Sequence, residues 1–223
     1  PVTYDELEPF YDKFDKLCGV SGKAGNLKGQ KIEGGNVFEG PRANEYPNPP
    51  LKTSAGALLL AEACKNVGYH PFPVPFSAPS RPYTNIYGVT LGSCEYCGFC
   101  GRTSCEANAK ATSATNVMPV LRREPKYTLK TRAFVSKILY DKQAKKVTGV
   151  TYTDMKTGEE YEQPAGIVIL SAFVFGNTHM MLYSGIGEPY DPKTGKGLVG
   201  KNLCYQFEAG ATAFFEGKVL NPF

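Results

Sequence analysis

The N-terminal part of the chain begins with a stretch whose apolar residues follow a helical period. From Thr3 to Leu17 they recur every three or four positions, which predicts an amphipathic helix. Proline lacks a backbone N–H and is tolerated in a first turn, so we expect the regular helix to begin near Glu8, with Pro9 in its first turn. The apolar positions are Leu7, Phe10, Tyr11, Phe14 and Leu17.

A second helix is predicted from Thr53 to Val67. Ser54 is a residue type that caps helix N-termini, and Gly68 suits the left-handed conformation in which helices commonly end. We expect the run from Leu58 to Ala63, which is the most apolar part of this helix, to be its buried stretch.

Three other segments of this half lack a helical period. Gly19 to Gly35 is rich in glycine, does not spell the nucleotide-binding pattern G-x-G-x-x-G after a strand, and predicts an exposed loop. Phe38 to Leu51 carries four prolines and predicts an extended, polyproline-like surface segment. His70 to Pro75 is proline-rich, which fits an edge strand rather than a central one.

Beyond residue 110 the pattern changes from helical to alternating. Thr112 to Arg123 predicts a short helix that ends at Pro125, and Asp154 to Glu159 contains the Lys-Thr-Gly sequence of a hairpin turn. Strands are predicted at Tyr127 to Thr131, Ala133 to Tyr140 and Lys146 to Thr153.

The last quarter of the chain combines a buried strand with a helix. Ile167 to Leu170 is a continuous apolar run, which predicts a strand that is buried on both faces. Phe175 to Ser184 follows as a predicted helix that stops at Gly185. Phe207 to Phe215 alternates weakly and predicts a last strand.

Composition narrows the class of protein. Of the 223 residues, 42% are apolar and 21% are charged, as in ordinary globular proteins, so we do not expect disorder. The 25 basic and 21 acidic residues nearly balance, and the basic run from Arg122 to Arg132 has no recognition motif beside it, so nucleic acid is not an expected partner. No apolar run approaches the length of a transmembrane helix, and no signal peptide is expected.

Four cysteines lie within twelve residues, in the order C-x2-C-x2-C-x4-C: Cys94, Cys97, Cys100 and Cys105. Thiolates at this spacing can close on one metal ion or cluster, and the bacterial ferredoxin run differs only in its last gap and its proline. Three cysteines at tight, equal spacing favour an iron–sulfur cluster, although four thiolates also suit zinc. The alternatives are free thiols in a glycine-rich loop or two local disulfides.

Two motifs near the C-terminus resemble landmarks of the glucose–methanol–choline (GMC) oxidoreductases. Ile169 to Gly187, ILSAFVFGNTHMMLYSGIG, is similar to the family's second signature, and Leu198 to Leu203, LVGKNL, is similar to the V-G-x-N-L that follows it. Phe173–Val174 stands in place of the signature's Gly-Ala, and Asn177–Thr178 stands in place of its Ser-Pro. The loop from Cys97 to Lys110 resembles that of the gluconate and 2-ketogluconate dehydrogenase flavoprotein subunits.

The resemblance implies an α+β fold, in which a GMC-type substrate domain with an antiparallel sheet and helices is joined to an incomplete part of the FAD-binding domain. It places residues 1–125 in the substrate domain, with the cysteine loop at 93–113, residues 126–200 in the FAD-binding domain, and residues 201–223 in the substrate domain again. The backbone of Val135 is expected to face the adenine, and Ser171 and Ala172 to lie near the cofactor. The resemblance also assigns Cys94, Cys97, Cys100 and Cys105 to an iron–sulfur cluster.

The function that the resemblance implies is FAD-dependent oxidation of a CH–OH group in a sugar or sugar acid. A cytochrome c and a small subunit are the implied partners, and the implied location is periplasmic, with peripheral membrane attachment through them. We expect the chain to be the central part of such an enzyme, without the glycine-rich finger for the FAD diphosphate and without the catalytic base, because neither His70 nor His179 matches that base. The alternative is a small iron–sulfur or zinc module for electron transfer or protein contact.

Overall fold

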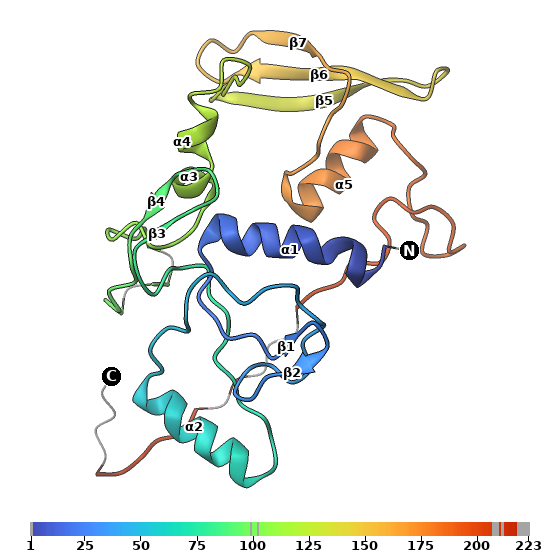
Figure 1. Cartoon of the computed structure of the whole chain (residues 1–223). Coiled ribbons are helices and arrows are strands. Elements are labelled where there is room, and N and C mark those ends of the chain that lie inside the picture. The colour runs from blue at the N-terminus through green and yellow to red at the C-terminus, as the bar shows by residue number, and fades with distance from the viewer. Residues whose placement is uncertain (1, 99, 102, 207–209, 211, 218–223) are drawn as a thin grey trace. The chain divides into compact units, whose positions relative to one another are not determined.

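The computed structural model describes the chain except for residues 1, 99, 102, 207–209, 211 and 218–223 (Figure 1). Two compact units share the chain: unit 1 comprises residues 1–128 and the segment from Phe214, and unit 2 comprises Leu129–Ala213. The expected division into substrate-domain and FAD-binding segments at 125/126 and 200/201 stays a prediction. Helices and small antiparallel sheets occur together, so the α+β class is confirmed.

Helix α1, Tyr4–Cys18, begins one turn earlier than predicted. A capping box explains the early start: the Thr3 side chain accepts a hydrogen bond from the Glu6 N–H, and the Glu6 carboxylate accepts one from the Thr3 N–H. Pro9 therefore lies in the second turn, where its missing N–H leaves the carbonyl four residues back without a helical partner. The Thr-x-x-Glu capping signal is visible in the sequence, but the predicted start near Glu8 was based on Pro9 instead.

Residues 19–26, the first part of the glycine-rich segment after α1, lie in the unit 1 core, so the prediction of an exposed loop was wrong for them. Residues 28–31 and 33–34 of the same segment are exposed, as predicted. Cys18, Val20, Ser21 and Ala24 are each at most 4% exposed. Ser21 forms an antiparallel bridge with Phe76, and its hydroxyl donates to the Ala78 carbonyl at 2.7 Å. Residues 19–26 are buried because the glycines lack a side chain and so let backbone approach backbone.

Gly25 and Gly35 show how close that approach is. A Cβ added to Gly25 would lie 2.0 Å from the Asn36 carbonyl oxygen, and one added to Gly35 would lie 2.2 Å from the Ala24 carbonyl oxygen. Real Cβ atoms do not come this near to backbone atoms, so both positions exclude every other residue type without a shift of the chain. The same stretch forms a two-residue hairpin ladder, β1 (Asn26–Leu27) with β2 (Gln30–Lys31).

A buried ionic cluster fastens the proline-rich segment 38–51 to α1. The Arg42 guanidinium donates to the Asp15 carboxylate at 2.6 Å and to the Glu39 carboxylate at 3.4 Å, and it stacks 3.8 Å from the Tyr46 ring. The three charged side chains are only 10–14% exposed. Burial raises the pKa of Asp15, although the hydrogen bond from Arg42 opposes the rise, and burial together with Glu39 raises the pKa of Tyr46.

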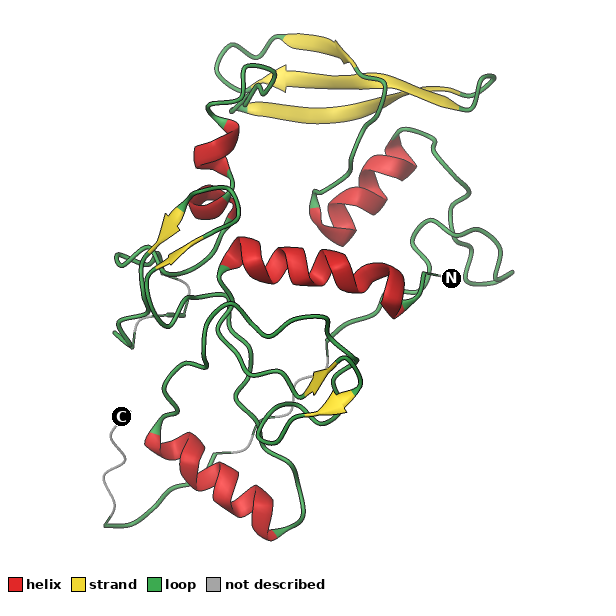
Figure 2. Ribbon diagram, viewed as in Figure 1, coloured by secondary structure: helices red, strands yellow, loops and turns green. Residues whose placement is uncertain are grey.

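Helix α2, Ala55–Asn66, has the predicted Ser54 cap, and Gly68 has the predicted left-handed backbone. The predicted burial was wrong: no residue of α2 is buried, and Leu58 and Leu60 are 58% and 65% exposed. An apolar run indicates a tendency to be buried, but it does not show which segment would cover it. In the described chain no helix or strand packs against α2. Figure 2 shows α2 as a red helix reached by loops at both ends.

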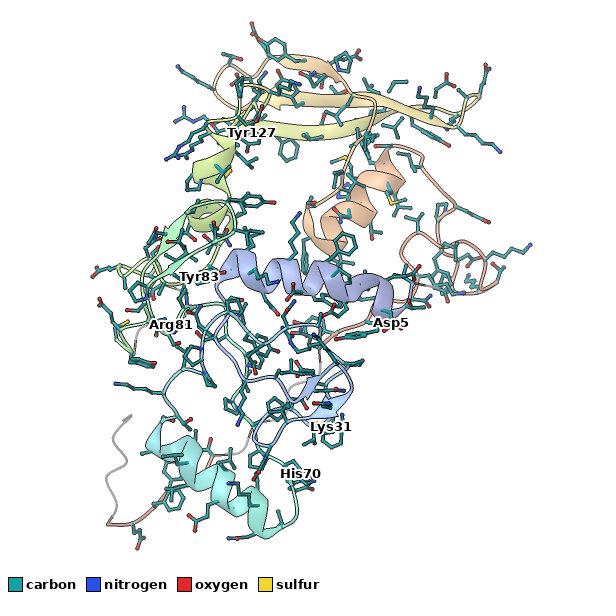
Figure 3. All side chains as sticks on the ribbon, in the orientation of Figure 1. Asp5, Lys31, His70, Arg81, Tyr83 and Tyr127 are labelled. Atoms are coloured by element: carbon teal, nitrogen blue, oxygen red, sulfur yellow. The ribbon has the colours of Figure 1, made fainter. Side chains whose placement is uncertain are left out.

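The remainder of unit 1 is mostly irregular. It contains the pair β3 (Tyr83–Thr84) and β4 (Thr90–Leu91), followed by two single-turn helices, α3 (Ser113–Asn116) and α4 (Met118–Leu121). The single helix predicted at 112–123 is thus broken at Val117, because Pro119 lies in the first turn of α4. The predicted strand at 70–75 does not form, and no strand is assigned there. The Tyr83 hydroxyl, labelled in Figure 3, donates to the Lys16 carbonyl at 2.7 Å.

Unit 2 is built on a three-stranded antiparallel sheet in the order β5-β6-β7. Its strands are β5 (Ala133–Asp141), β6 (Lys146–Asp154) and β7 (Glu160–Pro164). The predictions at 133–140, 146–153 and the turn at 154–159 are confirmed, whereas 127–131 is not a strand and β7 was not predicted. Helix α5, Phe173–Tyr183, ends before Gly185 at φ 67°, as predicted.

The apolar run at 167–170 differs from its prediction. It is not a strand, and Ile167 and Ile169 are each 82% exposed. A strand that is buried on both faces needs a sheet to join and a layer packed on each face of that sheet. The described chain pairs no strand with this run. The strand predicted at 207–215 lies partly outside the described residues, and the described ones among them form no strand. No helix that the structure describes is both long and apolar enough to cross a bilayer.

Candidate functional site

An open cavity of about 810 Å³ lies in unit 2, between the edge strand β5, the segment 168–172 and helix α5. We call it the β5–α5 groove. Its lining is mainly apolar, and none of the lining side chains is a carboxylate, ammonium or guanidinium. The lining residues are Ala133, Phe134, Val135, Ser136, Val150, Val168, Ile169, Leu170, Ser171, Ala172, Gly176, His179, Met180 and Tyr183.

The three residues expected near the cofactor all line this groove. Val135 comes from β5, and Ser171 and Ala172 come from the segment that leads into α5. Val135 lies 36 positions before Ser171 in the sequence, and the fold brings both to one cavity. Their contact with a cofactor stays a prediction.

Strand β5 carries an irregularity at the groove. The antiparallel register with β6 shifts between Val135 and Lys137, so Ser136 has no partner in the ladder. Its hydroxyl donates to the Thr151 carbonyl at 3.4 Å. Farther along the same edge, the Ile138 N–H donates to the Ser184 hydroxyl at 2.9 Å, which ties β5 to the end of α5. Bulges of this kind occur beside binding sites, where they re-aim the backbone.

Asn177 fixes the turn that carries Ser171 and Ala172. Its side-chain oxygen accepts the Ala172 N–H at 2.8 Å, and its side-chain nitrogen donates to the Leu170 carbonyl at 3.3 Å. This asparagine occupies the position of the family signature's serine. The asparagine at this position therefore has a structural role, because its side chain hydrogen-bonds to the backbone on both sides of Ser171.

Phe173 begins α5 in an unusual conformation. Its φ is 66°, in the left-handed region that favours glycine, and it stands where the family signature has glycine. A non-glycine residue there carries a strain of about 1–2 kcal/mol. The ring lines a second cavity of about 660 Å³ with Val174, Phe175 and the segment 203–206.

Sequence reasoning missed the contribution of α5 to the groove. Gly176, His179, Met180 and Tyr183 follow the pattern i, i+3, i+4, i+7, so they share one helix face, and all four line the groove. The spacing was visible in the sequence. The spacing does not show whether this face of the helix or the opposite one lies toward β5.

The cysteine loop lies in unit 1. The structure shows all four cysteines as free thiols, with Cys97 and Cys100 exposed and Cys94 and Cys105 half-buried. Backbone N–H groups of Lys110, Ala109 and Ala107 lower the pKa of the Cys105 thiol.

The four cysteines do not form a ready metal centre in this arrangement. No three histidine, cysteine or acidic side chains are gathered for a metal ion anywhere in the described part of the chain. The residues as placed thus do not fit a cluster or a zinc ion. Both assignments remain predictions from the spacing.

Comparison with known proteins gives the family. Residues 51–208 match the sequence model described as GMC oxidoreductase. The chain is 44% identical, over its whole length, to the gluconate 2-dehydrogenase flavoprotein of Pantoea cypripedii, of which it covers 37%. It is 29% identical, over 92% of its length, to the 2-methyl-1,2-propanediol dehydrogenase of Mycolicibacterium austroafricanum, of which it covers 34%.

A third similarity is local. Over 82 residues, 37% of the chain, it is 32% identical to the fructose dehydrogenase large subunit of Gluconobacter japonicus. The chain spans little more than a third of the length of the first two relatives. The family match covers the cysteine loop, β5 to β7, α5 and the groove that they form. The chain belongs to the GMC oxidoreductase family.

Proposed function

We propose that this chain is part of an FAD-dependent oxidoreductase that oxidises a CH–OH group of a sugar or sugar acid. The names of the relatives support the proposal: one is a gluconate dehydrogenase flavoprotein, one a propanediol dehydrogenase and one a fructose dehydrogenase. All three names refer to donors that carry hydroxyl groups. The gluconate relative matches the chain from end to end, so a sugar acid is the substrate class that we favour.

The observation that carries the proposal is the convergence of Val135, Ser171 and Ala172 on the β5–α5 groove. An adenine ring needs apolar walls and a backbone edge for its polar rim. The groove offers both, because β5 is an edge strand and its ladder is irregular at Val135. We assign the groove to the adenosine end of FAD, with the Val135 backbone against the adenine.

The chemistry divides between the cofactor and the chain. FAD, when bound, supplies the acceptor for the hydride that leaves the substrate carbon. The residues described here bind and orient: Ser171 and Ala172 form the wall beside the ligand, and Asn177 holds that wall in place through its two hydrogen bonds. No residue of this chain is assigned as the catalytic base.

Electron transfer to a cytochrome c, the association with a small subunit and a periplasmic, peripherally membrane-bound location are further parts of the proposal. They rest on the similarity to the gluconate 2-dehydrogenase flavoprotein. The described residues give no support to the alternative of an iron–sulfur or zinc module, because no three of their histidine, cysteine or acidic side chains are gathered for a metal ion.

We expect the 223-residue chain to bind FAD with a Kd of about 1 mM or weaker and to reduce no dye with gluconate, 2-ketogluconate or glucose. An adenine contact of one backbone hydrogen bond contributes only about 1 kcal/mol net, which cannot replace a diphosphate site. Replacing Ala172 with phenylalanine should fill the groove and weaken the binding at least about ten-fold. Saturation-transfer NMR with FAD, followed by a dye-reduction assay, measures both.

Ala144→Phe is the matched control, because Ala144 lies in the exposed turn between β5 and β6, outside the groove. Equal loss in both variants, or no loss in either, would refute the assignment of the groove. Micromolar binding by the unaltered chain would show that the chain holds more of the cofactor site than we assign to it.

A further inference from the structure

His179 has no assigned role, although it lies in the wall of the β5–α5 groove. It lies one turn after Gly176 and one turn before Tyr183 on the groove-facing side of α5. Its imidazole meets the Tyr183 ring edge-on, with centroids 6.4 Å apart and planes at 83°. The structure shows no hydrogen bond between this imidazole and another described residue, so its ring nitrogens are available to a ligand.

The other polar side chains of the groove are differently placed. The Ser136 hydroxyl is engaged with the Thr151 carbonyl inside the sheet. Ser171 lies in the turn that Asn177 holds, and the Tyr183 ring packs against the imidazole itself. His179 is the groove's one imidazole, and the described lining contains no charged carboxylate or amine that would compete for it.

The apolar wall and the imidazole complement two different parts of one ligand. Val135, Ala172 and Met180 provide surface for a flat heteroaromatic ring. An imidazole N–H is a donor for oxygen acceptors such as ribose hydroxyls and phosphate oxygens. A nucleotide contains both parts in one molecule.

We propose that His179 is a ligand-binding residue that donates a hydrogen bond to the ribose–diphosphate portion of the adenine nucleotide in the groove. This inference rests on the proposed function, because it takes the adenine end from that assignment. It adds a hydrogen-bond donor to the apolar walls that β5, the segment 168–172 and α5 provide. Tyr183 acts as a positioning residue, since its ring holds the imidazole at the groove.

The chain provides its own control. It contains two histidines, and the other one, His70, lies in unit 1, where its ring meets the Phe38 ring edge-on at 6.5 Å. Both imidazoles therefore have one aromatic neighbour, and only one of them lines the groove. Histidine-selective ¹⁵N labelling gives one set of imidazole signals for each unit, and His70→Gln and His179→Gln assign them.

Titration of the labelled chain with ADP tests the proposal. We expect the His179 signals to shift saturably and the His70 signals to stay in place. His179→Leu should weaken ADP binding about five-fold, as the loss of one hydrogen bond predicts, and His70→Leu should leave it unchanged. Adenosine then locates the contact: a shift with adenosine as well assigns it to the ribose, and a shift with ADP alone assigns it to the diphosphate.

Four results would overturn the inference. Equal shifts of both histidines, or the same His179 shift with inorganic phosphate alone, would mean that the imidazole senses any anion. ADP that perturbs Val135 and Ala172 but leaves His179 in place would refute the role of His179 and keep the proposed function. ADP that perturbs no groove residue would refute the groove as the adenosine site, and the inference with it.

Discussion

Replacing Arg42 with methionine is expected to destabilise unit 1 by about 3–5 kcal/mol, because it leaves two buried carboxylates without their cation. Arg42 is only 10% exposed and pairs with both Asp15 and Glu39. Methionine keeps much of the volume and removes the charge. Hydrogen exchange measured by mass spectrometry reports the loss locally: peptides covering residues 18–28 should lose protection, while peptides covering β5 and β6 in unit 2 should keep theirs.

Asp15→Asn is the companion variant, and it should cost clearly less than Arg42→Met. Burial already raises the pKa of Asp15, which means that the fold disfavours its charged form. Arg42 also keeps Glu39 as a partner in this variant. Arg122→Met, at an exposed arginine, should change stability by less than about 0.5 kcal/mol. If Arg42→Met were as mild as Arg122→Met, the cluster would contribute nothing to unit 1.

Gly25→Ala is expected to destabilise unit 1 by at least about 2–3 kcal/mol, because the added methyl group meets backbone rather than a movable side chain. Its Cβ would lie 2.0 Å from the Asn36 carbonyl oxygen. The Gly25 N–H also donates to the Glu39 carboxylate at 2.7 Å, so a shift of the backbone there disturbs the ionic cluster as well. Thermal unfolding monitored by circular dichroism, together with exchange of the 18–28 peptides, measures the effect.

Gly56→Ala provides the opposite case. Gly56 lies in α2, has no atom within 4 Å of an added Cβ and does not have a positive φ. Alanine there should stabilise the helix by a few tenths to about 1 kcal/mol, because it reduces the entropy that the chain loses on folding. The prediction concerns the sign: two glycine-to-alanine changes in one chain should act in opposite directions. A neutral Gly25→Ala would contradict the packing described for the glycine-rich segment.

Local signals in the sequence predicted the elements that local interactions determine. The Ser54 cap, the stop at Gly68, the turn at 154–159 and the strands that flank it follow from residue types within a few positions of each other. The stop of α5 at Gly185 is of the same kind. In each case the residues that carry the signal are also the residues that form the hydrogen bonds.

Long-range contacts explain what the sequence could not show. A glycine-rich segment without apolar period looks exposed, yet residues 19–26 lie in the core because segments from residues 36, 48 and 76–80 close over them. The run at 58–63 is as apolar as a core helix and remains exposed. Burial depends on which segments meet, and residue type gives only the tendency.

The candidate site divides in the same way. Val135, Ser171 and Ala172 were expected from the family resemblance, and the fold places them on one groove. The contribution of α5, including His179, depends on the orientation of that helix, which no single motif specifies. The cysteine spacing predicts a metal site that the described arrangement does not gather. Spacing shows which ligands a loop offers, and three-dimensional placement decides whether they converge.

The bond between the Asn116 side-chain amide and the Cys18 sulfur spans 98 positions of the chain, and the contact of Ser21 with Ala78 spans 57. The sheet of unit 2, in contrast, consists of two hairpins whose partners are close in sequence. Loops that close over long separations slow folding, whereas hairpins form within microseconds. In refolding from denaturant, the sheet of unit 2 is therefore expected to form before the core of unit 1, which is complete only when residue 116 meets residue 18.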